Sequence, residues 1–280
     1  EYLRIRHSIF MLASPHHTTS RQQFSDKCTP RSTGIPGLND ILNGGVLPGD
    51  IIEFYGKTGS GKTQLCLRLT AQFSHFSEDK ACVLYFDMKN DFNARRLLNL
   101  SEGDEDSLER VRIFREANLE RLLSRLDDIK NEVIGGINGF YSRCKLLVID
   151  SVPMVIYPAV QQETWRYHQE RLIKRLKWLA DHLNLTVILV NHSVSARSNL
   201  GGFSSSNSNS KPASSSSQPT SSQSGKAALG KYWQSKISIR IRLSKSNGST
   251  KDSYEGTLEK CFRTAKGHKF DFSIRQDSIV

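Results

Sequence analysis

Short apolar runs alternate with longer amphipathic runs along most of the chain. Strands are predicted at residues 51–56, 81–87, 111–114, 145–151 and 186–192. Helices are predicted at 62–76, in two stretches within 93–126, and at 163–183, where apolar residues recur at helical spacing. Strands that are apolar on both faces are typical of a parallel sheet covered by helices. This alternation predicts an α/β fold, with helices flanking a mostly parallel, twisted sheet.

The pattern changes after the last of these strands. Residues 198–225 consist largely of Ser, with Asn, Gln, Gly and Pro. Such a composition buries too little apolar surface to offset the entropy of ordering, so a disordered loop is predicted. The next segment, KISIRIRLSK, alternates with a period of two, which predicts a strand with its isoleucines inward and with Arg240 and Arg242 outward. Shorter strands up to FDFSIRQDSIV predict an antiparallel extension at the C-terminal end.

Composition narrows the class of protein. The 280 residues suffice for one α/β core, predicted at 32–280, preceded by a basic linker at 1–31; for residues 2–24 a transit peptide is the alternative. No run approaches the roughly 18 apolar residues that a membrane-spanning helix needs. The net charge of +11 favours a polyanionic partner such as nucleic acid. Five scattered cysteines without a C-x-x-C pair fit a reducing compartment and argue against a zinc site.

The strongest chemical signal is GKTGSGKT, which stands between a predicted strand and a predicted helix. It fits the phosphate-binding pattern G-x-x-x-x-G-K-[ST], in which backbone N–H groups and a helix N-terminus converge on phosphate oxygens. The predicted nucleotide ligands are Gly56, Lys57, Thr58, Gly59, Ser60, Gly61, Lys62 and Thr63. Lys62 supplies a cation for the β- and γ-phosphates, and the hydroxyl of Thr63 can bind Mg²⁺. Below, this segment is called the P-loop, and ATP with Mg²⁺ is the predicted cofactor.

A P-loop protein also needs an acid at the end of a neighbouring strand to hold Mg²⁺. The run KLLVID places Asp150 after four apolar residues. We therefore predict that Asp150 and Thr63 share the metal.

Several further segments occur in the order of the RecA-type recombinase core: STGIPGLNDILNGG, QLCLRL after the P-loop, VLYFD, LLVIDS, ILVNH and ALGKYW. Over roughly residues 30–280 the chain resembles the eukaryotic RecA-type recombinase paralogues, and is most similar to the D paralogue. The resemblance implies a RecA-like P-loop NTPase core that assists homologous recombination and DNA double-strand break repair in the nucleus. It also implies a hetero-oligomer with other paralogue subunits and the main recombinase, bound to single-stranded DNA, and a small helical domain ahead of residue 1.

In such proteins the loop after the last parallel strand faces DNA, which gives that role to residues 193–226. Basic and aromatic side chains near it are candidates for contacts with phosphates and bases, respectively. These are Arg197, Lys211, Lys226 and Lys231 for phosphates, and Tyr232 and Trp233 for stacking. The alternative left open is that Trp233 belongs to the core and the loop is a spacer.

The resemblance suggests two further contacts. FMLA fits the F-x-x-A pattern by which recombinases join a neighbouring core, which makes Phe10 and Ala13 candidate assembly residues; an apolar remnant of a helix is the alternative. Arg96 matches an arginine that packs near adenine, and a solvated helix charge is the alternative.

Two positions depart from an active recombinase. A glutamate that orients the attacking water is expected two residues after Asp87, but Lys89 stands there and is no base while protonated, with a reference pKa of about 10.4. Asp87 and Asp91 are the candidate substitutes. The glutamine expected to sense the γ-phosphate is His192, as in the D paralogue, and a histidine without ligand contact is the alternative.

Three functions follow from these features. The first is a recombinase paralogue with weak, DNA-stimulated ATPase activity. The second is a nucleotide-gated binding subunit without significant hydrolysis, and the third is another RecA-like ATPase, such as a helicase or a clock-type protein. Lys89 favours the second over the first, and ALGKYW with His192 argues against the third.

Overall fold

The computed structural model describes residues 28–76, 80–136, 139–159, 164–194, 226–246 and 252–280. The predictions for residues 1–27, including Phe10 and Ala13, and for the loop at 198–225 lie outside the described residues. The division into a linker at 1–31 and one core at 32–280 therefore stays a prediction.

The described strands form one sheet in the order β3-β2-β4-β5-β1-β7-β8-β9, with β6 paired to β5. Their bounds are β1 Ile51–Gly56, β2 Cys82–Asp87, β3 Val111–Phe114, β4 Cys144–Asp150, β5 Thr186–Val194, β6 Lys226–Ala227, β7 Ile239–Lys245, β8 Ser253–Lys260 and β9 Lys269–Ser273. All neighbours from β3 to β7 are parallel, whereas β8 and β9 join antiparallel. The predicted mostly parallel sheet with an antiparallel C-terminal extension is confirmed.

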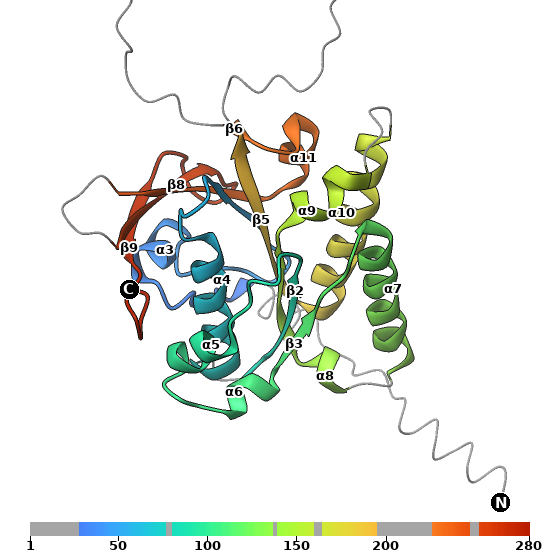
Figure 1. Cartoon of the computed structure of the whole chain (residues 1–280), viewed down its shortest axis with the longest axis horizontal. Coiled ribbons are helices and arrows are strands. Elements are labelled where there is room, and N and C mark those ends of the chain that lie inside the picture. The colour runs from blue at the N-terminus through green and yellow to red at the C-terminus, as the bar shows by residue number, and fades with distance from the viewer. Residues whose placement is uncertain (1–27, 77–79, 137–138, 160–163, 195–225, 247–251) are drawn as a thin grey trace, which may run out of the picture.

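Helices cover both faces of this sheet (Figure 1). Their bounds are α3 Pro36–Ile41, α4 Lys62–Ala71, the π-helical turn η1 Gln72–Phe76, α5 Ala94–Leu100, α6 Asp106–Glu109, α7 Leu119–Gly135, α8 Gly139–Ser142, α9 Val152–Ile156, the 3₁₀ turn η2 Tyr157–Ala159, α10 Trp165–Leu183 and α11 Gly230–Lys236. Helices α3, α4 and α5 lie on one side, and α7, α9 and α10 lie on the other (Figure 1).

The sheet packs against one hydrophobic core on each of its two faces, because side chains alternate along every strand. In β4, Leu146 and Val148 belong to the core under α4, while Leu147 and Ile149 belong to the core under α10. Because successive side chains of a strand point to opposite faces, a continuous apolar run fills both cores at once. The runs predicted as buried strands are buried for this reason.

Helix α7 is longer than its sequence pattern predicts. The predicted helical stretch ends at Leu126, but α7 continues to Gly135 and stops where Gly136 adopts φ 62°. Such left-handed backbone costs a glycine no Cβ clash, so Gly136 terminates the helix. At the other end, the side chain of Asn118 accepts a hydrogen bond from the backbone N–H of Arg121.

The prediction for strand β7 is wrong at one position. Arg240 does not face outward: it is 4% exposed, and its Nε lies 2.5 Å from Oε2 of Glu53, which is fully buried. The reason is that β7 lies between β1 and β8, and residue 240 is directly opposite Glu53 on β1. Alternation predicts that Arg240 faces solvent, but helices cover this face of the sheet, and Arg240 pairs with Glu53 on the neighbouring strand instead.

All five cysteines are free, and Cys66, Cys82 and Cys144 are buried as small core residues. Within the described part of the chain, no helix combines the length and the apolar character that crossing a bilayer requires.

Candidate nucleotide site

The carboxyl ends of four parallel strands bring the predicted site residues to one edge of the sheet. Gly56 at the end of β1 is directly opposite His192 on β5, and Asp87 at the end of β2 is directly opposite Asp150 on β4. The P-loop then connects β1 to the N-terminus of α4. Ligands of open parallel sheets bind at this kind of edge.

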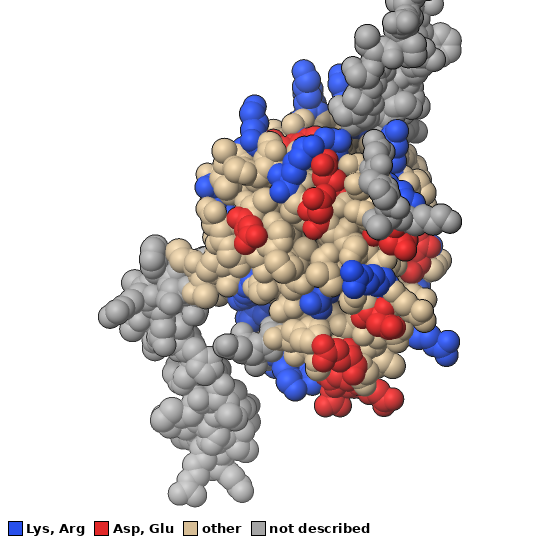
Figure 2. Space-filling model, turned by 90° about the vertical axis from the view of Figure 1, so that its left-hand side faces the viewer, with Lys and Arg blue, Asp and Glu red and all other residues tan. Residues whose placement is uncertain are grey.

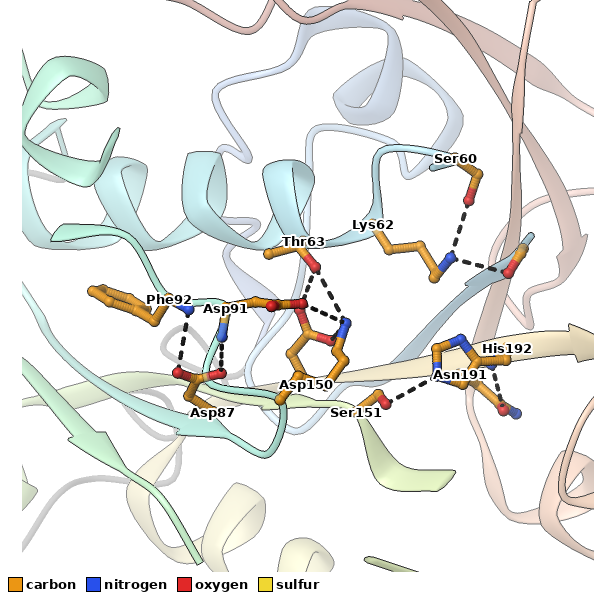
Figure 3. A network of polar contacts seen from close by, with 12 residues as sticks. Ser60, Lys62, Thr63, Asp87, Asp91, Phe92, Asp150, Ser151, Asn191 and His192 are labelled. Atoms are coloured by element: carbon orange, nitrogen blue, oxygen red, sulfur yellow. Dashed lines mark hydrogen bonds and ion pairs between the residues drawn. The ribbon is translucent and has the colours of Figure 1, made fainter. Parts of the chain in front are cut away.

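The P-loop closes around the ammonium group of Lys62. Its Nζ donates hydrogen bonds to the carbonyls of Gly56 at 3.0 Å and Lys57 at 2.7 Å, and to the Ser60 hydroxyl at 3.2 Å (Figure 3). The side chain is buried, and this burial, together with the charge of Lys89, lowers the pKa of Lys62 to about 8. With a nucleotide present, phosphate oxygens are better acceptors for this ammonium than carbonyls are.

A polar contact joins the P-loop to β4. The hydroxyl of Thr63 donates to Oδ2 of Asp150 at 2.6 Å, and both groups lie at the centre of the network in Figure 3. The sequence predicted these two residues as joint Mg²⁺ ligands, and the structure brings them into contact.

The side chain of Lys89 reaches the same two residues. Its Nζ lies 2.7 Å from Oδ1 of Asp150 and 3.5 Å from Oγ1 of Thr63, with Oδ2 of Asp91 at 3.7 Å. Burial alone lowers the pKa of Lys89, but the charge of Asp150 and its hydrogen bond outweigh burial, so the pKa is raised. Lys89 is therefore a cation at neutral pH and no general base.

The donor set of Thr63 and Asp150 suits Mg²⁺, which prefers oxygen ligands, but the surroundings do not. Oδ1 of Asp150 is buried and accepts no hydrogen bond. The ammonium of Lys89, at 2.7 Å, compensates its negative charge. Two unit charges about 4 Å apart repel by about 4 kcal/mol at an effective dielectric constant of 20, and a divalent ion doubles that charge. With Lys89 in this position, Mg²⁺ does not fit between Thr63 and Asp150. Among the described residues, no group of three or more His, Cys, Asp or Glu is placed to hold a metal.

The two candidate substitutes for the missing glutamate have different surroundings. Both carboxylate oxygens of Asp87 are occupied: Oδ1 accepts from the backbone N–H of Asp91 at 3.0 Å, and Oδ2 accepts from that of Phe92 at 3.2 Å (Figure 3). Oδ2 also accepts from Nε of Arg115 at 3.3 Å. Asp87 is thus engaged in fixing the turn after β2. Asp91 is more than half exposed, and its carboxylate lies 3.7 Å from the ammonium of Lys89.

His192 lies beside the P-loop at the end of β5. Its Nε2 is 3.2 Å from the hydroxyl of Ser151, and its backbone N–H donates to the side chain of Asn191 at 2.7 Å (Figure 3). Burial lowers the pKa of His192, and the charges of Lys62 and Lys89 lower it further. A neutral imidazole next to the first P-loop glycine agrees with the predicted role at the γ-phosphate, which stays a prediction.

Arg96 sits on α5 against the first turn of α4. Its Nε donates to Gln64 at 2.9 Å, and its Nη1 contacts the carbonyl of Gln276 near the C-terminus. It is half-buried and held on two sides, so it is not a freely solvated charge. Contact with adenine stays a prediction.

The predicted DNA-binding residues separate into three groups. Lys226 and Lys231 are exposed at β6 and α11, and Tyr232 is half-buried with its hydroxyl 3.3 Å from Glu170. Arg197 and Lys211 lie outside the described residues. Trp233 is 1% exposed, so the prediction that it stacks on bases is wrong. The core alternative holds for Trp233.

Trp233 belongs to a buried polar network whose members no local sequence pattern predicts. Glu53, in the middle of β1, accepts hydrogen bonds from the indole N–H of Trp233 at 2.8 Å and from Nδ2 of Asn191 at 2.7 Å, and pairs with Arg240. Asn191 also donates to the carbonyl of Ala228 at 2.9 Å. One sequence feature could have indicated this network: Glu53 stands inside the apolar run IIEFYG, and a buried charge requires partners. The network joins the P-loop strand to the segment that begins at residue 226.

Comparison with known proteins agrees with this arrangement. Residues 26–224 match the family model described as Rad51. The chain is 32% identical over 170 residues to the DNA repair protein RAD51 homolog 4 of Bos taurus, covering 58% of this chain and 52% of that protein. It is 29% identical over 181 residues to the DNA repair protein RAD51 homolog 2 of Homo sapiens, covering 57% and 45%. The chain thus spans about half the length of these curated relatives.

The fold has a counterpart among solved structures. The crystal structure of the RadB recombinase superposes with a TM-score of 0.65 at 22% identity, covering 89% of this chain and 98% of that one. Homologs 4 and 2 match at similar identity, so assignment to the D paralogue stays a prediction. The family match, which spans well over half of the chain, establishes that this chain belongs to the Rad51 family.

Proposed function

We propose that this chain is an ATP-binding recombinase paralogue that serves homologous recombination and DNA double-strand break repair by holding its nucleotide rather than by rapid turnover. The observation that carries the proposal is the ammonium of Lys89, 2.7 Å from Asp150, where an active recombinase has a water-orienting glutamate. The intact P-loop around Lys62 supports nucleotide binding.

The expected loss of turnover follows from the missing base. General base catalysis contributes about 10²–10⁴-fold to a rate. Asp87 is engaged by two backbone N–H groups and Arg115, and the carboxylate of Asp91 is exposed to water and faces the cation of Lys89 at 3.7 Å. Neither carboxylate is arranged to replace the glutamate, so a weak residual ATPase activity is expected.

Binding and single-turnover hydrolysis of ATP, measured on the same preparation with and without single-stranded DNA, test the proposal. ATP is expected to bind, and hydrolysis to stay slower than that of an active recombinase by about 10²-fold or more. Lys62→Ala is expected to weaken ATP binding by about tenfold or more, because it removes a charge-assisted contact to phosphate. Fast turnover that Lys62→Ala abolishes would contradict a nucleotide-holding role.

For DNA, we propose that single-stranded DNA contacts the protein at the edge where β6 and α11 lie. Lys226 and Lys231 are exposed there, with the ring of Tyr232 between α10 and Lys236. Figure 2 shows the side of the molecule that is on the left in Figure 1; basic side chains project toward the top there, with acidic side chains among them, at the end of the molecule where β6 lies. This charge favours a polyanion.

The double variant Lys226→Ala/Lys231→Ala is expected to weaken binding of a single-stranded oligonucleotide. The slope of log affinity against log salt is expected to fall by about 0.7 for each lost phosphate contact. Fluorescence anisotropy at several salt concentrations measures both quantities. The control Lys266→Ala/Lys269→Ala removes the same charge from the β8–β9 turn and the start of β9, and should leave the slope unchanged. Equal effects of both variants would mean that only net charge matters.

The partners we propose are other paralogue subunits and the main recombinase, in a nuclear hetero-oligomer. The similarity to two proteins named as RAD51 homologs supports this proposal. Purifying the protein with its native partners from nuclear extract would test it. Recovery of the chain alone, without a recombinase subunit, would contradict it.

A further inference from the structure

We infer that Lys89 is a built-in cation that takes the place of the divalent metal, so that this site binds a nucleoside triphosphate without Mg²⁺. The inference rests on the proposed nucleotide binding and adds how the site neutralises the phosphates. Its basis is the position of the Lys89 ammonium, 2.7 Å from Asp150 and 3.5 Å from Thr63. These are the two residues whose oxygens would otherwise bind the metal.

The turn that carries Lys89 is fixed on both sides. Before it, the backbone N–H of Met88 donates to the carbonyl of Asp150 at 2.8 Å, which extends the pairing of β2 with β4. After it, the carboxylate of Asp87 accepts from the backbone of Asp91 and Phe92. Asn90 has φ 58°, the left-handed backbone that lets the chain reverse here. The turn therefore directs Lys89 toward Asp150.

The surroundings also oppose exchange of the ammonium for a metal ion. The side chain of Asp150 is 2% exposed and that of Lys89 is 19% exposed, so solvent screens their ion pair less than a surface pair. A metal between Thr63 and Asp150 would cost Lys89 its ion pair with buried Asp150 and leave it only the exposed carboxylate of Asp91 at 3.7 Å, whose attraction water screens. It would also leave two cationic groups, Lys62 and Lys89, beside the new ion.

The positive charge of the site determines whether metal-free ATP or its magnesium complex binds more tightly. Metal-free ATP is more negative than its magnesium complex, and the site offers it the ammonium groups of both Lys62 and Lys89. A site that relies on a metal uses the bound ion, together with the P-loop lysine, to neutralise the charge of the β- and γ-phosphates. This chain is therefore expected to bind metal-free ATP at least as tightly as magnesium–ATP.

Calorimetric titration of the full chain with ATP, once in excess Mg²⁺ and once in EDTA, tests the inference. The wild-type affinity in EDTA is expected to equal or exceed that in Mg²⁺. Lys89→Met is expected to lose about tenfold or more of the affinity in EDTA, since it removes a charge-assisted contact. Lys89→Arg keeps the charge and should retain binding in EDTA, and Lys266→Met is the charge-matched control on the surface.

The outcomes separate this inference from the proposed function. Wild-type binding that needs Mg²⁺ would overturn the inference and leave nucleotide binding intact. Absence of binding in both buffers would overturn both. If Lys89→Met does not fold, the comparison of wild type with Lys89→Arg decides: tight binding of both in EDTA supports the inference, and weak binding of both in EDTA contradicts it.

Discussion

Replacing Lys89 by glutamate is expected to raise single-turnover hydrolysis of ATP about 100-fold, the lower end of what a general base contributes. The turn after β2 carries this side chain to the edge of the sheet where Thr63 and Asp150 meet. A carboxylate at position 89 stands where an active recombinase has its water-orienting acid. Quenched-flow measurement of product with excess enzyme, in Mg²⁺ and in EDTA, gives the rate.

The control for this prediction is Lys89→Gln. It removes the same positive charge and has nearly the same length as glutamate, but it offers no base. A gain with glutamate alone assigns the effect to proton transfer. An equal gain with both variants would mean that the Lys89 cation itself inhibits hydrolysis. No gain with either would mean that the geometry around His192 or the P-loop limits the rate, and the proposed role of position 89 would be wrong.

Much of the fold follows from patterns that are local in sequence. Continuous apolar strands such as KLLVID indicate burial on both faces, and this indication holds for β4 because helices cover both sides of the sheet. The P-loop was also predictable, since its glycines and Lys62 act within one short segment. The direction of the C-terminal strands follows from their short connections.

The errors have a common cause, which is contact between residues far apart in sequence. Alternation predicts Arg240 on the outer face, and the resemblance offers Trp233 for base stacking with the core as the alternative, because each segment is considered alone. Both side chains instead meet Glu53, at sequence separations of 187 and 180 residues. A lone acid in an apolar strand predicts that it has buried polar partners. Which residues these are depends on the order of the strands in the sheet, and no local sequence pattern gives that order.

The position of Lys89 shows the same limit inside the site. The sequence shows that a lysine stands where a glutamate is expected, and therefore that a base is missing. Its placement between Asp150 and Thr63 depends on the pairing of β2 with β4 and on the bonds that Asp87 makes within the turn. Only the assembled sheet shows that the lysine which replaces the acid contacts Asp150 and Thr63, the two predicted Mg²⁺ ligands.

Arg240→Met is expected to lower the free energy of unfolding by about 3–5 kcal/mol, because it leaves the charge of Glu53 buried without its ion-pair partner. Glu53 would keep its bonds from Trp233 and Asn191, but neither donor is charged. Arg242→Met on the same strand is the matched control. Its pair with Glu259 is about one-third exposed, so about 0–1 kcal/mol is expected. Urea unfolding of wild type and both variants gives the two differences.

The double variant Glu53→Gln/Arg240→Met identifies the cause of the loss. Glutamine keeps an oxygen that can accept from Trp233 and Asn191, and it carries no charge that needs Arg240. Most of the stability lost in Arg240→Met should therefore return, since an uncompensated buried charge costs far more than a neutral, hydrogen-bonded group. A double variant no more stable than Arg240→Met would mean that Arg240 acts through its packing on Tyr55, whose ring centroid lies 4.9 Å from the guanidinium. In that case the ion pair between Glu53 and Arg240 would not be what stabilises the pairing of β1 with β7.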